Sequence, residues 1–337
     1  MTEAVRHGLL GYGAGGRVFP APLIAAAPGI RFLGVVTRSA QRRASLDAGV
    51  AAFDTLADLA AAGAESVTVC TPAATHAELA LQAVRLGLAV VVDKPFARSA
   101  ADARAVATAA ADAGVPLSVY QNRRWDSDFR TVRRLVGEGA LGDVRRFESR
   151  FERWDPNREP SVAGGGTLLD FGAHLVDQAT QLCGPVARVH AEMRGTGDLD
   201  DDVFVALHHE RGVESHLWGS WRQAAPGPRF RVTGTTGTYI VDGMDSQEAV
   251  LKAGRSPAQL GDRGGVEPEH TWGRLYRGAT GAPVPSERGR WDLFYPAFAA
   301  AVRGDAPAPV DPWDAVRSME ILEAARTAAA TGTTVSL

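Results

Sequence analysis

The sequence predicts an α/β protein of two domains: an N-terminal doubly wound parallel sheet and a C-terminal α/β domain with an open, mostly antiparallel sheet. The length of 337 residues exceeds the size at which one hydrophobic core keeps growing. Up to Gln121, short β-rich runs alternate with Ala-rich helical runs, which is typical of a parallel sheet. Beyond Gln121, strand-like runs follow one another with few helices between them, which is typical of antiparallel pairing. We therefore expect domains at residues 1–121 and 122–337.

Short apolar runs separated by helical stretches define the first domain. Two of the helical stretches, residues 75–86 and 100–113, end at Gly87 and Gly114, and glycine suits a helix C-cap. Uninterrupted apolar runs such as residues 90–92 are typical of strands buried on both faces of a parallel sheet. The expected strands are residues 7–11, 31–37, 50–53, 66–70, 89–93 and 117–120.

The second domain is expected to form an antiparallel sheet, because its strand-like runs are joined by short turns. A glycine run at residues 164–166 opens an expected helix at residues 167–182. Residues 254–290, rich in Gly, Pro and Arg, predict a long surface loop. The expected strands are residues 144–151, 187–193, 203–209, 213–221 and 229–234, and the other helices are residues 127–136, 291–302 and 313–330.

Charge and cysteine content narrow the function classes. The formal net charge of −3 makes neither nucleic acid nor an anionic membrane an expected partner. Cys70 and Cys183 lie in apolar segments, so we expect buried, reduced thiols rather than a disulfide. The sequence shows no signal-peptide pattern, and no apolar run approaches the about 18 residues that span a bilayer. These features favour a cytoplasmic protein.

A glycine-rich motif, GYGAGG at residues 11–16, fits G-x-G-x-x-G between an expected strand and an expected helix at residues 17–27. In this position the glycines allow a tight turn, a close approach of a pyrophosphate to the backbone, and close packing of helix on strand. The motif predicts a Rossmann dinucleotide-binding domain. Pro20 and Pro22 predict that the first helical turns are irregular. The residues expected at the cofactor here are Gly11, Tyr12, Gly13, Gly15, Gly16, Arg17 and Val18.

The end of the second strand predicts which dinucleotide is bound. A site for NAD usually has Asp or Glu there, to accept hydrogen bonds from the ribose 2′-hydroxyl. Here the strand ends in Thr37 and Arg38, and Arg42 and Arg43 follow one helical turn later. Hydroxyls and guanidinium groups attract a 2′-phosphate, so the sequence favours NADP over NAD. The alternative is that these arginines form only a solvated helix face.

Lys94 is a candidate catalytic residue because it follows the fifth strand at its carboxyl end. Ligands bind at this edge of an open α/β sheet. Pro95 ends the strand and favours an extended geometry for the residues before it. A lysine there can donate a hydrogen bond to a hydroxyl or carbonyl oxygen. The alternative is an ordinary surface lysine.

Asp170 and His174 are spaced four residues apart on the helix after the glycine run, so they share one face. Oxidation of an alcohol needs a group that takes the hydroxyl proton, and a neutral imidazole suits this near pH 7. Asp177 and Gln178 extend the polar face by one turn. The alternative is an exposed acid–base pair that only stabilises the helix. No Cys/His cluster supplies further metal ligands, so no metal is expected.

Taken together and in this order, the motifs resemble the Gfo/Idh/MocA family of oxidoreductases. The likeness covers essentially the whole chain. It includes GYGAGGRVF at residues 11–19, TPAATH at residues 71–76, DKP at residues 93–95 and GGGTLLDFGAH at residues 164–174. The resemblance implies that Lys94, Asp170 and His174 form the catalytic group. It also implies contacts with the cofactor from Thr71, Pro72, His76, Asp93, Lys94 and Asn122.

A narrower likeness is visible in YQNRRWDSDF at residues 120–129 and FESRF at residues 147–151. Both look like the branch that contains NADP-dependent scyllo-inositol dehydrogenases. The chain departs from the family pattern at Asp93, where glutamate is commoner, and at Pro20, where relatives often have histidine. Neither departure removes a group that can transfer a proton.

The resulting hypothesis is an NAD(P)-dependent dehydrogenase or reductase acting on CH–OH groups of a sugar, inositol or related polyol. His174 exchanges the proton, Lys94 polarises the oxygen, and Asp170 positions the substrate or His174. Arg124, Trp125 and Trp154 are further candidates for substrate contact, with ordinary packing as the alternative for each.

Two alternatives use the same fold. One is a non-catalytic dinucleotide-binding sensor that regulates a partner, although Lys94, Asp170 and His174 argue against it. The other is an enzyme that retains its cofactor for redox-neutral chemistry.

The C-terminal sheet predicts self-association. Its strands carry apolar and aromatic residues on what we expect to be an uncovered face: Phe204, Leu217, Trp218 and Trp221. An uncovered apolar sheet face needs burial. We therefore expect a homo-oligomer, a dimer or a tetramer, formed sheet to sheet as the resemblance also implies.

Overall fold

A computed structural model describes residues 3–47, 49–157, 165–196 and 199–337. The chain forms two compact units. Unit 1 comprises Met1–Asn122, Gln247–Gly264 and Arg290–Val316. Unit 2 comprises Arg123–Ser246, Gly265–Gly289 and Arg317–Leu337. Within the described residues, every helix is too short or too polar to cross a lipid bilayer.

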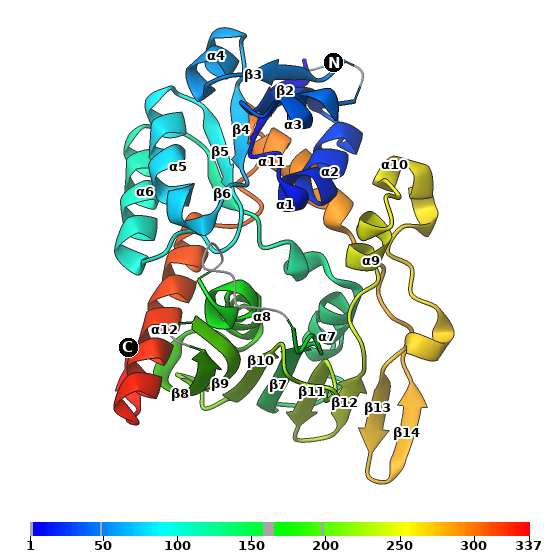
Figure 1. Ribbon diagram of the computed structural model, residues 1–337. Helices are drawn as coiled ribbons and strands as arrows, with labels where there is room; N and C mark the ends of the chain where they lie inside the picture. The colour runs from blue at the N-terminus through cyan, green and yellow to red at the C-terminus, as the bar shows by residue number, and fades with distance from the viewer. Residues whose placement is uncertain (1–2, 48, 158–164, 197–198) are drawn as a thin grey trace. The chain divides into compact units, whose positions relative to one another are not determined.

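Unit 1 contains a parallel sheet of strand order β3-β2-β1-β4-β5-β6, the order of a doubly wound dinucleotide-binding domain (Figure 1). Every strand expected before residue 121 is confirmed, with bounds that differ by one or two residues. All four residues of β5 are buried, as expected for a strand covered on both faces. The strands are β1 Val5–Leu10, β2 Ile30–Val36, β3 Ala51–Phe53, β4 Ser66–Val69, β5 Ala89–Val92 and β6 Leu117–Val119.

Helices cover this sheet. The irregular first helix expected from Pro20 and Pro22 is confirmed, because α1 (Ala14–Val18) ends before α2 (Pro20–Ala26) begins. Pro20 is the first residue of α2, where its missing N–H costs no hydrogen bond. The other helices between these strands are α3 Ala40–Ala44, α4 Leu56–Ala61, α5 His76–Arg85 and α6 Ala100–Asp112.

A late segment of the chain completes unit 1. It contains α11 (Phe294–Arg303), whose Tyr295 ring lies 5.6 Å from the imidazole of His7 on β1. Phe294 packs edge-on against Tyr120, with ring centroids 4.8 Å apart. The predicted division after residue 121 differs from the compact units here, because these contacts join segments that lie 288 and 174 residues apart and leave no local sequence signal.

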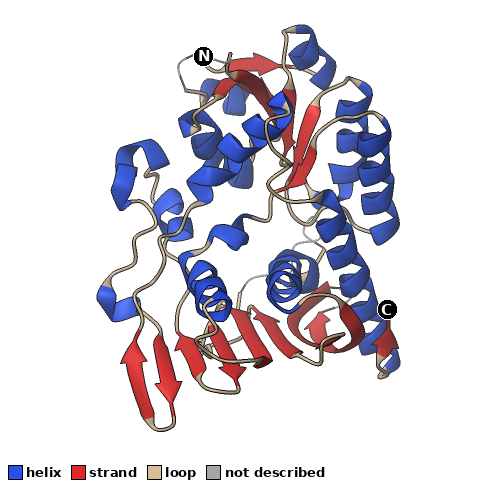
Figure 2. Ribbon diagram, turned by 180° about the vertical axis from the view of Figure 1, so that it is seen from behind, coloured by secondary structure: helices blue, strands red, loops and turns tan. Residues whose placement is uncertain are grey.

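Unit 2 contains a sheet of strand order β14-β13-β12-β11-β7-β10-β9-β8-β15. Its strands are drawn in red in Figure 2. The pair β7/β10 is parallel and the other paired strands are antiparallel, so the sheet is mixed but mostly antiparallel. The strands are β7 Val144–Glu152, β8 Val186–Thr196, β9 Leu199–His209, β10 Glu214–Ser220, β11 Phe230–Gly234, β12 Thr238–Val241, β13 Arg274–Arg277, β14 Thr280–Pro283 and β15 Val335–Ser336.

Helices α7 (Ser127–Gly137) and α8 (Ala173–Cys183) lie over one face of this sheet (Figure 1, Figure 2). The last helix is α12 (Pro312–Thr331). The strands β9 and β10 alternate between buried and partly exposed residues, as one face packed and one face open requires.

The predicted loop at residues 254–290 is wrong in one respect, because it contains the hairpin β13–β14, which extends the sheet. Its strands carry exposed or half-buried residues such as Arg274 and Arg277. Edge strands often carry charged side chains, so they lack the apolar pattern by which strands are predicted. The same region also contains α10 (Pro257–Leu260), while α9 (Gln247–Lys252) precedes it.

The prediction that Leu217 and Trp221 lie on the uncovered sheet face is wrong. Leu217 is 1% exposed and Trp221 is 8% exposed, and the Trp221 ring packs on Phe171 at 4.8 Å. Both therefore belong to the face that the helices cover. Phe204 and Trp218, by contrast, are partly exposed on the other face and contact each other at 5.3 Å.

Candidate active site

The glycine turn joins β1 to α1 at the carboxyl end of the parallel sheet. Gly11 has a φ of +103°, and a Cβ there would lie 2.3 Å from the carbonyl oxygen of Cys70. A Cβ on Gly16 would lie 2.0 Å from the carbonyl oxygen of Gly11. A Cβ on Gly13 would meet no described heavy atom within 4 Å. The first and last glycines are therefore required by packing, whereas Gly13 leaves space beside the backbone, as a bound pyrophosphate requires.

The end of β2 carries the residues expected at a 2′-phosphate. The Arg43 guanidinium donates to the carbonyl oxygen of Thr37 at 3.0 Å and pairs with Asp54 at 2.5 Å. Arg43 is therefore held by groups of the protein. Arg38 and Arg42 are exposed, and Arg38 donates a long bond of 3.5 Å to the carbonyl oxygen of Asp54. These two arginines are the better placed to meet a phosphate.

The turn after β4 contains Thr71, Pro72 and His76. His76 is 1% exposed, and its ring nitrogens lie 2.8 Å from the carbonyl oxygens of Pro95 and Thr71. The imidazole therefore ties the turn after β4 to the turn after β5. This contact gives His76 a structural task in holding both turns at the sheet edge.

Asp93 and Lys94 follow β5, and the Lys94–Pro95 peptide is cis. One oxygen of Asp93 accepts from the backbone N–H of Lys94 at 2.8 Å, and the other accepts from the thiol of Cys70 at 3.1 Å. Burial, and then the charge of Asp93, raise the pKa of the Cys70 thiol well above its usual value, so the sulfur keeps its proton. Lys94 is half-buried, and Asp93 fixes its backbone.

Asp170 and His174 lie where a π-helical segment, Leu168–Gly172, passes into α8. This corrects the regular α-helix expected over residues 167–182. Such widened turns recur at functional sites. Gly166, with a φ of +89°, precedes the segment, and a Cβ there would lie 2.4 Å from Oδ1 of Asp200. The carboxylate of Asp200 accepts from the backbone N–H of Leu168, which fixes the start of the segment.

His174 is 5% exposed, so the alternative of a solvated acid–base pair does not hold for the histidine. Its ring centroid lies 6.1 Å from that of Phe151 on β7, and Phe151 stacks on Phe171 at 3.9 Å. The guanidinium carbon of Arg123 lies 4.6 Å from the Phe151 centroid, and that of Arg153 lies 5.0 Å from it. The imidazole therefore sits beside an aromatic pair that two cations contact.

These neighbours of His174 are not predicted from the sequence. Phe151 and Phe171 lie in the motifs at residues 147–151 and 164–174, but the sequence alone predicts no contact of either ring with His174. Arg123 lies in the motif at residues 120–129, where the sequence predicts no particular role for it, and Arg153 lies outside the motifs. The position of Arg153 depends on strand pairing, because its backbone bonds with Ser220 and Gln223 hold it.

The residues expected at the substrate differ in their surroundings. Arg124 is 8% exposed and forms a bidentate pair with Asp177 at 2.6 and 2.9 Å. Trp125 is partly exposed, and Trp154 is 58% exposed. Trp154 pairs through its backbone with Arg222. Arg124 is thus engaged inside the protein, whereas the two tryptophans present ring surface to solvent.

The candidate residues fall in two groups, one in each unit. Unit 1 brings together the glycine turn, the end of β2 and the turns that carry Thr71 and Lys94. Unit 2 brings together Asp170, His174 and Arg124. Among the described residues, no group of three or more His, Cys, Asp or Glu side chains is arranged to hold a metal ion.

A doubly wound sheet with an open glycine turn, followed by a mixed sheet whose helix carries a buried histidine, defines a class of dinucleotide-dependent oxidoreductases. Comparisons with protein-family models agree. Residues 5–121 match the oxidoreductase family with an NAD-binding Rossmann fold, and residues 129–240 match the GFO/IDH/MocA C-terminal domain. The chain belongs to the Gfo/Idh/MocA family of oxidoreductases.

Several relatives match over nearly their full length. The scyllo-inositol 2-dehydrogenase (NADP(+)) IolW of Bacillus subtilis is 31% identical, covering 96% of this chain and 93% of IolW. The oxidoreductase YdgJ of Escherichia coli is 34% identical, covering 96% of both chains. Among solved structures, the oxidoreductase YvaA of Bacillus subtilis superposes with a TM-score of 0.94 at 29% identity, covering 100% of this chain and 99% of YvaA.

Proposed function

We propose that this chain is an NADP-preferring dehydrogenase that transfers a hydride between nicotinamide and a carbon–oxygen centre of a sugar, inositol or related polyol. The observation that carries the proposal is the buried His174, one turn from Asp170, in a chain that keeps an open glycine turn at Gly13. The names of relatives support the substrate class, since they include scyllo-inositol 2-dehydrogenase and D-apiose dehydrogenase.

The proposed chemistry divides the alcohol's hydrogen atoms between two acceptors. A nicotinamide coenzyme, when bound, accepts the hydride from carbon. His174 takes the hydroxyl proton as a general base and returns it in the reverse direction. The Lys94 ammonium donates a hydrogen bond to the same oxygen and favours its deprotonated form. Asp170 orients the substrate or the imidazole.

The preference for NADP rests on the end of β2. No carboxylate stands at Thr37–Arg38 to meet a ribose 2′-hydroxyl, and the exposed Arg38 and Arg42 suit a 2′-phosphate. The backbone N–H groups at the start of α1 have no intrahelical partners, so they suit the pyrophosphate. IolW, which is named for NADP, supports the same choice.

Self-association through the unit 2 sheet is part of the proposal. Its open face carries Phe204 and Trp218 beside a hollow of about 330 Å³. The Arg150 guanidinium lies 3.9 Å from the Trp218 ring centroid. Charged residues also line the hollow: Glu192, Arg194 and Asp202. A second copy of this face would cover the exposed rings.

A turnover screen tests the function. Purified protein is titrated with NADP and with NAD, and each complex is assayed with inositols, aldoses and their keto forms. Steady NADPH production or consumption with a polyol or keto sugar is the expected result. Tight NADP binding without turnover on any member of the panel would instead favour a sensor, and isomerised product without net cofactor consumption would favour a redox-neutral enzyme.

A further inference from the structure

The helix that carries His174 is anchored one turn further along by a buried ion pair. Asp177 is 1% exposed and Arg124 is 8% exposed. The Nε and Nη2 atoms of Arg124 donate to Oδ2 and Oδ1 of Asp177 at 2.9 and 2.6 Å. Two parallel bonds from a planar guanidinium fix orientation as well as distance. The pair therefore constrains both the position of α8 along its axis and its rotation about it.

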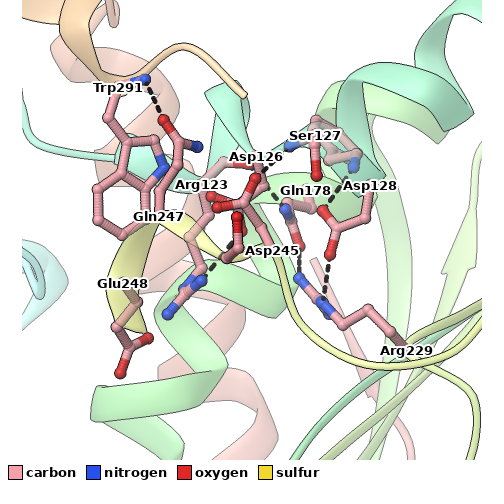
Figure 3. Close-up of polar contacts among 12 residues, drawn as sticks. Arg123, Asp126, Ser127, Asp128, Gln178, Arg229, Asp245, Gln247, Glu248 and Trp291 are labelled. Carbon is pink, nitrogen blue, oxygen red and sulfur yellow. Dashed lines mark hydrogen bonds and ion pairs between the residues drawn. The ribbon is translucent and has the colours of Figure 1, made fainter. Parts of the chain in front are cut away.

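A second set of bonds holds the next residue of the same helix. The side-chain amide of Gln178 donates to the carbonyl oxygen of Arg123 at 2.9 Å and accepts from Nη2 of Arg229 at 2.7 Å (Figure 3). Arg229 also donates to the hydroxyl of Ser149 on β7 at 2.7 Å. Helix α8 is thus tied both to the segment Asn122–Trp125 and to the sheet.

Arg123 and Arg124 therefore each contact a group that packs against His174 or belongs to its helix. Arg124 fixes the helix that carries the imidazole. The Arg123 guanidinium packs 4.6 Å from the centroid of Phe151, and that ring lies 6.1 Å from the ring of His174. The motif at residues 122–125 is thereby linked to His174 by way of Asp177 and Phe151.

We propose that Arg124 is a positioning residue for His174, acting through its bidentate pair with Asp177. The proposal rests on the proposed function, because it takes His174 as the group that exchanges the proton. It replaces the substrate contact expected for Arg124 from the sequence. A buried ion pair often adds little net stability compared with apolar side chains of similar volume, so the pair's distinctive contribution is the orientation of α8.

A double variant that removes both charges tests whether the pair orients α8 or only stabilises the fold. Arg124→Met and Asp177→Leu each leave one buried charge without its counter-ion, and each should lower the Tm. The double variant should regain most of the lost Tm. Its kcat should nevertheless stay about 10²-fold below wild type, because small misplacements of a catalytic group cost rates of this order. KM should change far less than kcat.

Arg124→Lys and a distant ion pair provide the controls. Arg124→Lys keeps the charge but loses the planar guanidinium. It should fold like wild type and have a reduced kcat. If the double variant does not fold, Arg124→Lys still tests the positioning role. Arg134 on α7 pairs with Glu287 at 2.7 Å, and neither residue belongs to α8. Arg134→Met with Glu287→Leu should leave kcat unchanged.

A double variant that is as stable and as active as wild type would overturn the proposal, as would wild-type kcat in Arg124→Lys. A readout without turnover keeps the inference separate from the proposed function. The imidazole Cε1–H resonance of His174 is assigned by its loss in His174→Gln and is titrated by NMR. If wild type turns over no substrate, the proposed function fails. If the chemical shift and the titration midpoint of His174 are then unchanged in the double variant, the positioning role is overturned. A change that occurs in the double variant and not in the Arg134/Glu287 control would support it.

Discussion

The imidazole of His7 lies 2.8 Å from the hydroxyl of Thr68, inside the parallel sheet of unit 1. Its other ring nitrogen lies 2.7 Å from the hydroxyl of Ser66, and Thr68 continues the chain to the hydroxyl of Tyr295 at 3.1 Å. His7 is fully buried, and burial lowers its pKa from 6.5 to about 3. The imidazole is therefore neutral in the folded protein at every pH at which the enzyme is expected to work.

This burial makes unit 1 sensitive to acid. The folded pKa of His7 lies below the unfolded pKa, so the unfolded state binds more protons as the pH falls below 6.5. The free energy of unfolding should therefore decrease between pH 6.5 and pH 3, by up to about 1.4 kcal/mol per pH unit from this group. Urea unfolding of wild type and His7→Gln at pH 7 and pH 5 measures the effect. His7→Gln should lose less stability than wild type over this interval, and equal losses would show that another group dominates.

Substitutions at two glycines of the motif, Gly13 and Gly16, should separate folding from cofactor binding. Gly13 has a φ of −77° and open space at its Cβ position, so Gly13→Ala should keep the Tm of wild type. The added methyl group occupies the space proposed for the pyrophosphate, so NADP affinity should fall. Gly16→Ala places a Cβ against the carbonyl oxygen of Gly11 and should lower the Tm. Thermal unfolding and NADP fluorescence titration measure both effects. Unchanged NADP affinity in Gly13→Ala would contradict the proposed pyrophosphate site beside this glycine.

The sequence predicted the elements that depend on residues close together in the chain. The strands of unit 1 follow from their apolar runs, and the glycine turn and the break before Pro20 follow from residue type alone. The π-helical segment Leu168–Gly172 was not foreseen, because its apolar spacing also fits an ordinary helix. The hairpin β13–β14 was missed because its strands lie at the sheet edge and carry few buried residues.

Parts of the candidate site depend on contacts between distant segments, and these could not be predicted. The spacing of Asp170 and His174 placed both at the start of one helix. The pairing of Arg124 with Asp177 links residues 53 positions apart, and one sequence contains no signal for it. Trp221 was expected on the uncovered sheet face, yet it alternates in step with the buried Leu217, and its ring packs on Phe171.

His174→Ala should lower kcat by about 10²–10⁴, the usual effect of losing a general acid–base group. Affinity for NADP should stay close to that of wild type, because the glycine turn lies in the other unit. Stopped-flow rates of NADPH formation and equilibrium NADP titrations measure the two quantities. Unchanged turnover would mean that another group exchanges the proton.

Arg38→Ala should weaken NADP binding much more than NAD binding, because the guanidinium is proposed to meet the 2′-phosphate. Arg43→Ala serves as the matched control, since its guanidinium pairs with Thr37 and Asp54 within the protein. Isothermal titration with both dinucleotides compares the variants. Equal losses for NADP and NAD in Arg38→Ala would discredit the phosphate contact.

Trp218→Glu should dissociate the proposed oligomer. The ring lies on the open face of the unit 2 sheet beside Phe204, so the substitution removes its apolar surface and places a carboxylate where a second copy would pack. Sedimentation velocity at micromolar concentration should give a dimer or tetramer for wild type and a monomer for the variant. Val266→Glu, at a residue that is 56% exposed, is the matched control and should keep the wild-type mass. A wild-type protein that already sediments as a monomer, or a variant that keeps the oligomeric mass, would remove this sheet face from the interface.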